Sequence, residues 1–431
     1  MLETLVSILA LVLSSAKQAD PPAETLVKLT VDPMPAPKPA LRYLLLPELR
    51  EMTPGNPIPN YLKCLLDQDF STTDEALGRA ALKQADRAAR MDKPDWQILP
   101  RLRTDGVGLL LPDLQKMRAL ATELQKRFRD EIALRRFDDA LATAKTMFAL
   151  SRHLGEHPTL IGGLVGVAVA TVAIAPLEEM LEQPGCPNLY WALTNLPTPL
   201  ITFATGLEGE RMLVLAEFRD LDDTRPMTAA QLKKAIQRLE LLREIGRGEK
   251  KAIEYLGEHA ADEKYMAAAR ERLIDSGIPA ERLDTFSTYQ VVLLNERMEY
   301  EIRRDEAMKF CNLPTWEAIP RLDAITPPKG RALFDSFTVA LQKIRRAQGR
   351  LEQRVALLRH VEAVRLYAAA HAGRVPEALA AVDVPLPVDP FTGKPFRYEV
   401  KDGAAHLRGS PPKGDEQNPA YNLHYEITIR K

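Results

Sequence analysis

Several kinds of functional site need residues that this sequence contains only sparsely. The 431 residues include three cysteines, Cys64, Cys186 and Cys311, which are far apart and form no Cys-x-x-Cys pair. This spacing excludes a cysteine-based zinc site and a disulfide framework, and it leaves room for one bridge at most. Lys and Arg number 58 against 59 Asp and Glu, so the net charge is -1. Because nucleic-acid binding needs an excess of basic side chains, we predict no nucleic-acid partner.

Common catalytic signatures are also missing. The sequence has no G-x-x-x-x-G-K-[ST], G-x-G-x-x-G or G-x-S-x-G string, so it signals neither a phosphate-binding loop nor a nucleophile elbow. One catalytic string does occur, because His153, Glu156 and His157 form H-x-x-E-H. Two His on one helical face could bind zinc, with the Glu as general base. Gly155 and Pro158 favour the alternative that a helix ends here, where the helix dipole favours His.

The composition favours helices over sheets. Aromatic residues make up only 6% of the chain, Ala and Leu recur throughout, and 33 prolines fall in clusters between apolar segments. From Leu111 the apolar residues recur at steps of three and four, which is the spacing of one buried helical face. The run RRFDDALATA, residues 135–144, locally resembles a helix of a tetratricopeptide hairpin, but the 34-residue period does not repeat. We predict a mainly α fold of helical hairpins.

Two uncharged apolar segments bear on localisation. Residues 1–19 contain an apolar run, Leu5–Leu13, followed by small residues, which is the pattern of a signal peptide despite Glu3 and the absence of a basic residue. We predict a signal peptide there, an extracytoplasmic location (periplasmic or secreted), and membrane contact only through this segment. An ordinary first helix is the alternative. Residues 159–177 form the second segment, which we predict to be a buried core helix, with a membrane span as the alternative.

Changes in composition divide the rest of the chain. Residues 20–40 are rich in proline and predict an extended surface linker, and residues 41–325 predict an α-helical domain. Residues 330–431 predict a long helix, from about Arg331 to His371, followed by a small α+β module. Within the helix, the run QKIRRAQGRLEQR predicts a solvated face, because charge runs usually face water.

The most distinctive stretch, PVDPFTGKPFRYEV, begins at Pro387 and predicts a structural turn leading into a strand. Asp before Pro is extended, and its side chain can bond forward to the backbone. Gly can take positive φ, and Pro cannot pair inside a ladder. The turn residues that we assign are Asp389, Pro390, Phe391, Gly393 and Pro395.

Residues 357–431 resemble the soluble module of the major pseudopilin of type II secretion. The resemblance consists of a long helix, this turn, an aromatic-led strand with Tyr398 and a final strand. In that family a wholly apolar membrane helix polymerises, and acidic residues of the C-terminal loop hold calcium. Here the helix carries many Arg, Glu and Gln residues, and the loop has only Asp415 and Glu416. The resemblance therefore implies the fold module, without polymerisation and without calcium. The whole chain also resembles a family of uncharacterised bacterial exported proteins, which supplies no activity.

These patterns lead to one functional hypothesis and two alternatives. We expect a non-enzymatic, extracytoplasmic scaffold or protein-interaction protein with a protein partner of unknown identity and no cofactor. One alternative is a zinc-dependent hydrolase that uses His153, Glu156 and His157. The other is a membrane protein that spans the bilayer at residues 159–177.

Overall fold

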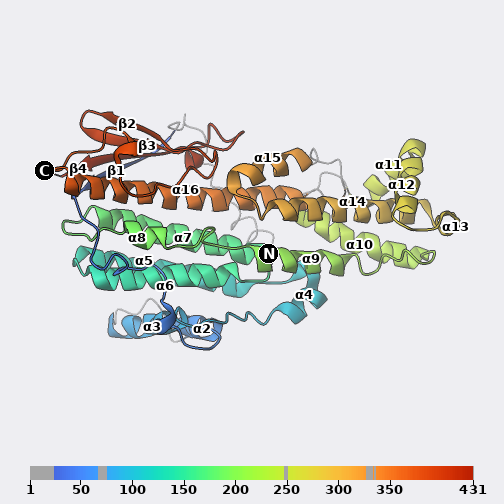
Figure 1. Ribbon diagram of the computed structural model, residues 1–431. Coiled ribbons are helices and arrows are strands. Elements are labelled where there is room, and N and C mark those ends of the chain that lie inside the picture. Colours follow the sequence, from blue (N-terminus) through green and yellow to red (C-terminus); the bar gives the residue numbers. More distant parts are fainter. Residues whose placement is uncertain (1–23, 67–74, 247–250, 327–332, 334–335, 431) are drawn as a thin grey trace. The chain divides into compact units, whose positions relative to one another are not determined.

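The computed structural model describes residues 24–430 except 67–74, 247–250, 327–332 and 334–335 (Figure 1). The predicted signal peptide, residues 1–19, lies outside the described residues. The protein is mainly α-helical with one small mixed β-sheet, which confirms the predicted fold class. The described residues fall into two compact units.

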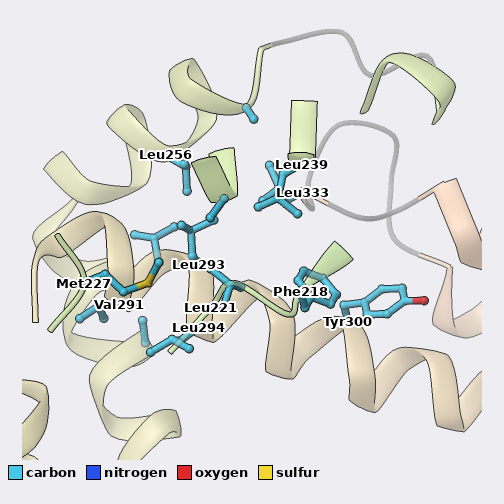
Figure 2. Packing of buried hydrophobic residues seen from close by; sticks show 14 of the residues in the cluster. Phe218, Leu221, Met227, Leu239, Leu256, Val291, Leu293, Leu294, Tyr300 and Leu333 are labelled. Atoms are coloured by element: carbon cyan, nitrogen blue, oxygen red, sulfur yellow. The ribbon is translucent and has the colours of Figure 1, made fainter. Parts of the chain in front are cut away.

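Unit 1 takes Gln97–Leu110 and Leu207–Arg345. Its elements are α4 (Leu99–Asp105), η2 (Gly106–Gly108), α9 (Ala204–Glu217) from Leu207 onward, α10 (Ala229–Gly246), α11 (Ala252–Ala261), α12 (Glu263–Asp275), α13 (Ala280–Leu283), α14 (Thr288–Phe310), α15 (Thr315–Ile325) and α16 (Ser336–Ala370) up to Arg345. Figure 2 shows its apolar core, in which Leu221, Met227, Val291 and Leu293 gather between the helices.

Unit 2 takes the described residues up to Trp96, then Leu111–Gly206 and the residues from Arg346 onward. Its helices are η1 (Leu49–Glu51), α2 (Ile58–Leu66), α3 (Glu75–Ala88), α5 (Pro112–Ala133), α6 (Phe137–Gly155), α7 (Leu160–Leu181), α8 (Tyr190–Thr194), α16 (Ser336–Ala370) from Arg346 onward, η3 (Leu379–Ala381) and η4 (Pro419–Tyr421).

Helix α7 is the apolar segment that we predicted to be a core helix. Among the described helices it alone is long and apolar enough to cross a membrane, and 72% of its most apolar window is buried inside the protein. Its glycines permit close packing on α6, since a Cβ at Gly166 would lie 2.6 Å from the carbonyl oxygen of Ser151. Small residues at such a contact let two helix backbones approach closely.

The sheet contains a strand that we did not predict. Its order is β1-β4-β3-β2, built from β1 (Thr25–Val31), β2 (Arg397–Lys401), β3 (Ala404–Arg408) and β4 (Leu423–Ile429). Strands β2, β3 and β4 are antiparallel as expected, whereas β1 adds parallel to β4, with Thr25 opposite Leu423. The prediction of a surface linker over residues 20–40 is therefore wrong for residues 25–31, which belong to the sheet. The prolines that motivated the linker lie on either side of TLVKLTV, which alternates like a strand.

The solvated face predicted for QKIRRAQGRLEQR on α16 is wrong over the part that lies in unit 2. Figure 1 shows the sheet lying beside α16. Gln348 and Gln353 of this run are buried. Gln353 has no exposed surface and donates to Asp389 Oδ1 and to the Ser410 carbonyl, both at 3.0 Å. Arg354 donates to both oxygens of Glu178 at 2.6 and 2.9 Å, and the Tyr425 hydroxyl donates to the same carboxylate.

The Gln353 amide nitrogen and the Arg354 guanidinium each meet a polar partner, which offsets the cost of removing them from water. A charged or amide side chain without such a partner would lose several kcal/mol on leaving water. The charge run therefore attaches the helix to α7, β4 and the turn at Asp389. Charge content alone did not reveal this, because the partners are far away in the sequence.

A fully buried ion pair lies nearer the end of α16. Glu362 and Arg365 have 0% exposed side chains, and Arg365 Nη1 lies 2.9 Å from Glu362 Oε2. The other guanidinium hydrogens go to backbone carbonyls, with Nε 3.0 Å from the Asp32 oxygen, Nη1 3.3 Å from that of Pro187 and Nη2 2.7 Å from that of Cys186. One pair thus joins α16 to the residue after β1 and to the loop before α8.

We expect Arg365→Ala to lower the free energy of unfolding by about 3–5 kcal/mol, because it leaves the Glu362 carboxylate buried without its cation. Arg129→Ala is the matched control, since Arg129 binds Glu179 at 2.7 Å with both side chains nearly half exposed. That loss should stay below about 1 kcal/mol. Urea unfolding of the two variants measures the difference, and equal losses would show that the buried pair is not a major anchor.

Candidate functional site

The zinc hypothesis placed His153, Glu156 and His157 on one helical face. In the structure α6 ends at Gly155, so His157 lies beyond the helix. Each side chain contacts a different group. His153 Nδ1 lies 3.0 Å from the Tyr61 hydroxyl, and His157 Nδ1 lies 2.9 Å from Thr159 Oγ1.

Glu156 is also bonded elsewhere, since its Oε2 accepts from the Thr205 hydroxyl at 3.1 Å. Across the described ranges no group of three or more His, Cys, Asp or Glu side chains could hold a metal ion. The geometry fits the alternative stated for this string, that a helix ends here.

The two imidazoles are held in the neutral form. Burial lowers the pKa of His153 to about 4, and the charge of Arg152 acts in the same direction. Burial alone lowers the pKa of His157 to about 3, and its ring contacts Trp96 edge-on at 4.7 Å between centroids. The Trp96 indole also donates to the His153 carbonyl at 3.2 Å. These contacts make the cluster a packing element of unit 2 that depends on neutral histidines.

The Asp389 segment folds into a turn around a buried carboxylate. Gly393 has φ +66°, and its N–H donates to the Asp389 carbonyl at 2.8 Å. The side chain of Asp389 is 1% exposed, and it accepts from the Phe391 and Ser410 N–H groups at 3.0 and 2.7 Å and from Gln353. Burial raises the pKa of Asp389, and these three hydrogen bonds partly offset that rise. The carboxylate joins the turn, α16 and the chain after β3.

The remaining turn residues have different surroundings. Pro390 is buried, Pro395 is exposed, and the ring of Phe391 lies edge-on to Tyr421 with 5.8 Å between centroids. No ligand-binding geometry surrounds these side chains among the described residues. The turn positions the start of β2, which follows Pro395 by two residues.

The outward face of the sheet carries a chain of ionisable side chains that sequence reasoning missed. His424 Nδ1 lies 3.0 Å from Glu24 Oε1, and His424 Nε2 lies 3.0 Å from His406 Nδ1. One of the two facing nitrogens donates and the other accepts, so the two imidazoles share one hydrogen between these atoms. Desolvation raises the pKa of Glu24, but the hydrogen bond and charge of His424, together with Arg408, outweigh it and leave this pKa below its ordinary value.

Alternation along β3 and β4 was the available signal for this chain. His406 and Arg408 alternate with buried Leu407, and His424 and Glu426 alternate with Tyr425. Their neighbours could not be read from one sequence, because pairing across strands depends on register.

The outer edge of β2 is the most exposed part of the sheet. Strand β2 is last in the order β1-β4-β3-β2, so β3 is its only partner strand within the described chain. Four of its five residues are exposed, and only Tyr398 is half-buried. An edge strand of this kind presents backbone N–H and C=O groups to other chains. Strand β1 is the other edge of the sheet, and β2 has the larger exposed share of residues.

Comparisons with protein-family models, with curated proteins and with solved structures find no match to the chain.

We expect Asp389→Ala to lower the free energy of unfolding by at least about 2 kcal/mol. The change removes the acceptor of the Phe391 and Ser410 N–H groups and one of the two acceptors of the buried Gln353 amide, and leaving a buried donor unpaired costs about 1–3 kcal/mol. Asp383→Ala is the control, since Asp383 is an exposed residue in the same connecting segment. Its effect should stay within about 0.5 kcal/mol. Chemical denaturation measures both, and an equally small effect of Asp389→Ala would contradict this account of the turn.

Acidification should destabilise the protein through its buried histidines. Their folded pKa values, about 4 for His153, 3 for His157 and 4 for His360, lie below the ordinary value of 6.5. The unfolded chain therefore binds more protons between pH 6.5 and 4, so stability is complete above pH 6.5 and falls as the pH drops towards 4.

His157→Gln removes one of these titrations. Between pH 7 and pH 5 the variant should lose about 2 kcal/mol less than the parent protein, because one proton contributes about 1.4 kcal/mol per pH unit. Urea titrations at the two pH values provide the comparison. The same pH dependence in both proteins would mean that His157 is not held neutral by the fold.

Proposed function

We propose that this chain is a non-enzymatic, extracytoplasmic protein-interaction protein, and that the free edge of β2 is its docking element. One observation carries the proposal, namely an exposed edge strand on a sheet fixed to the helical body of unit 2 by buried polar contacts. An extended segment of a partner can add to such an edge through main-chain hydrogen bonds. A fixed edge loses little conformational freedom on binding, which favours affinity.

The extracytoplasmic location rests on the signal-peptide pattern of residues 1–19 and on the resemblance to bacterial exported proteins. The three cysteines are consistent with either compartment, because all of them are free thiols. The hydrolase alternative gains no support from His153 and His157, whose Nδ1 atoms face the hydroxyls of Tyr61 and Thr159. The membrane-span alternative gains none from α7, most of whose side chains are buried within unit 2.

Photo-cross-linking at Val400 tests this function in the cell that encodes the protein. Val400 lies in β2 and is 41% exposed, so a photoreactive phenylalanine analogue there should form a defined adduct with another protein. The matched control places the same probe at Ile274 of α12, which is 43% exposed. Cell fractionation of the adduct then tests the location.

An adduct at Val400 and none at Ile274, recovered outside the cytoplasm, would support the proposal. No adduct at Val400, or equal labelling at both positions, would contradict docking at β2. Recovery of the adduct only from the cytoplasm would contradict the location while leaving the docking element in place.

A further inference from the structure

We infer that the segment that docks on β2 is an extended strand with two acidic side chains four residues apart, an inference that rests on the proposed function. Three features specify this partner: the charges on the edge strand, their cross-strand neighbours and the exposed Val400.

The outward face of β2 is predominantly basic. Side chains alternate between the faces of a strand, so Arg397, Glu399 and Lys401 share one face. Across from them on β3 lie Arg408, His406 and Ala404. Arg397 and Arg408 are therefore cross-strand partners of like charge.

The one carboxylate on this face of β2 is already occupied. Arg408 donates to Glu399 through Nη1 at 2.5 Å, and this contact with its charge lowers the pKa of Glu399. Lys401 adds only a weaker electrostatic attraction to Glu399, and neither Arg397 nor Lys401 forms an ion pair within the described ranges. Two exposed cations thus remain at the ends of the strand.

The spacing of these cations fixes the spacing of the anions that would meet them. Arg397 and Lys401 are four residues apart on one face, and a strand added beside β2 in either direction has residues opposite both positions at the same spacing. Opposite charges directly across strands stabilise a pair, and an acid at each end would also reduce the repulsion between Arg397 and Arg408.

The other face of β2 adds an apolar preference. Val400 is 41% exposed on this face, whereas the Tyr398 hydroxyl is bonded to the Pro376 carbonyl. A partner residue opposite Val400 would cover this apolar surface. This partner residue is adjacent in sequence to the acid that faces Lys401. The expected motif therefore has an apolar residue next to one acid, on the side toward the other acid.

A second copy of this chain cannot present an acid to both Arg397 and Lys401, because β2 carries a single carboxylate, Glu399. Antiparallel pairing of β2 with itself about Glu399 would place Glu399 opposite Glu399 and Arg397 opposite Lys401. Like charges directly across strands are destabilising. Registers centred on Tyr398 or Val400 would pair Glu399 with only one of the two cations. A partner with acids at both positions therefore matches this edge better than a second copy does.

Peptide binding to the full chain tests the inference. The probe is a seven-residue peptide of Thr and Val, with Glu at its second and sixth positions and Val at its third, labelled with an uncharged dye. Two further peptides carry Gln or Lys at the same two positions. Fluorescence anisotropy should show the Glu peptide binding at least tenfold more tightly than the Gln peptide, with affinity that falls as salt is added.

Charge reversal on the protein is the complementary arm. Arg397→Glu with Lys401→Glu should weaken binding of the Glu peptide at least tenfold and strengthen binding of the Lys peptide. The control, Lys83→Glu with Arg87→Glu, reverses two exposed charges with the same four-residue spacing on α3 and should leave binding unchanged. Unchanged thermal unfolding of both double variants, and the gain for the Lys peptide, would show that the sheet is still folded.

Equal binding of the Glu and Gln peptides would overturn the acidic-partner inference. Binding of the Glu peptide that the β2 reversal leaves intact would overturn it as well, since the site would lie elsewhere. The absence of binding by any peptide, together with a Val400 adduct in cells, would overturn this inference and leave the proposed function standing. The absence of the Val400 adduct is the outcome that removes the proposed function.

Discussion

The buried pair formed by Glu362 and Arg365 is the contact on which the arrangement of unit 2 depends most. Burying both charges costs several kcal/mol, and the structure offsets this cost by giving each charge further hydrogen bonds. Arg365 donates to the carbonyls of Asp32, Pro187 and Cys186, and Glu362 Oε1 accepts from the Leu189 N–H at 3.0 Å. The end of β1, the loop before α8 and helix α16 must therefore assemble together, because none of these partners is satisfied alone.

Other buried polar side chains of α16 in unit 2 also receive their partners from different elements. Gln353 binds the Asp389 turn, and Arg354 binds Glu178 of α7, which also accepts from Tyr425 of β4. Polar side chains in such positions specify one arrangement, because any shift leaves a buried group unpaired. The consequence for function is a small sheet held in one place, with its most exposed strand, β2, at the free edge.

The sequence allowed the local features to be predicted and concealed the long-range ones. The core helix at 159–177 follows from its uncharged apolar run, and the long helix ending near His371 and the C-terminal strands follow from periodicity. The turn chemistry of Asp389 and Gly393 follows from backbone preferences. Strand β1 was missed because its alternation lies between two proline clusters and its partner, β4, is at the other end of the chain.

For the site, the H-x-x-E-H string drew attention to side chains that the fold uses for packing. The chain of Glu24, His424 and His406 was not seen, since strand register brings those residues together. The exposed edge of β2 could not be foreseen either, because strand order is a property of the whole sheet.

Native-state hydrogen exchange measured peptide by peptide across unit 2 tests the central claim most directly. If α16 and the sheet are joined as described, amides of β1, β3 and β4 should exchange with the same free energy of opening as those of α7 and of α16 beyond Arg346. They should also respond together as denaturant is raised. The contrary result is that the strands exchange through a separate opening of much lower free energy while α7 and α16 stay protected. That result would contradict the claim that buried polar contacts fix the sheet to the helices.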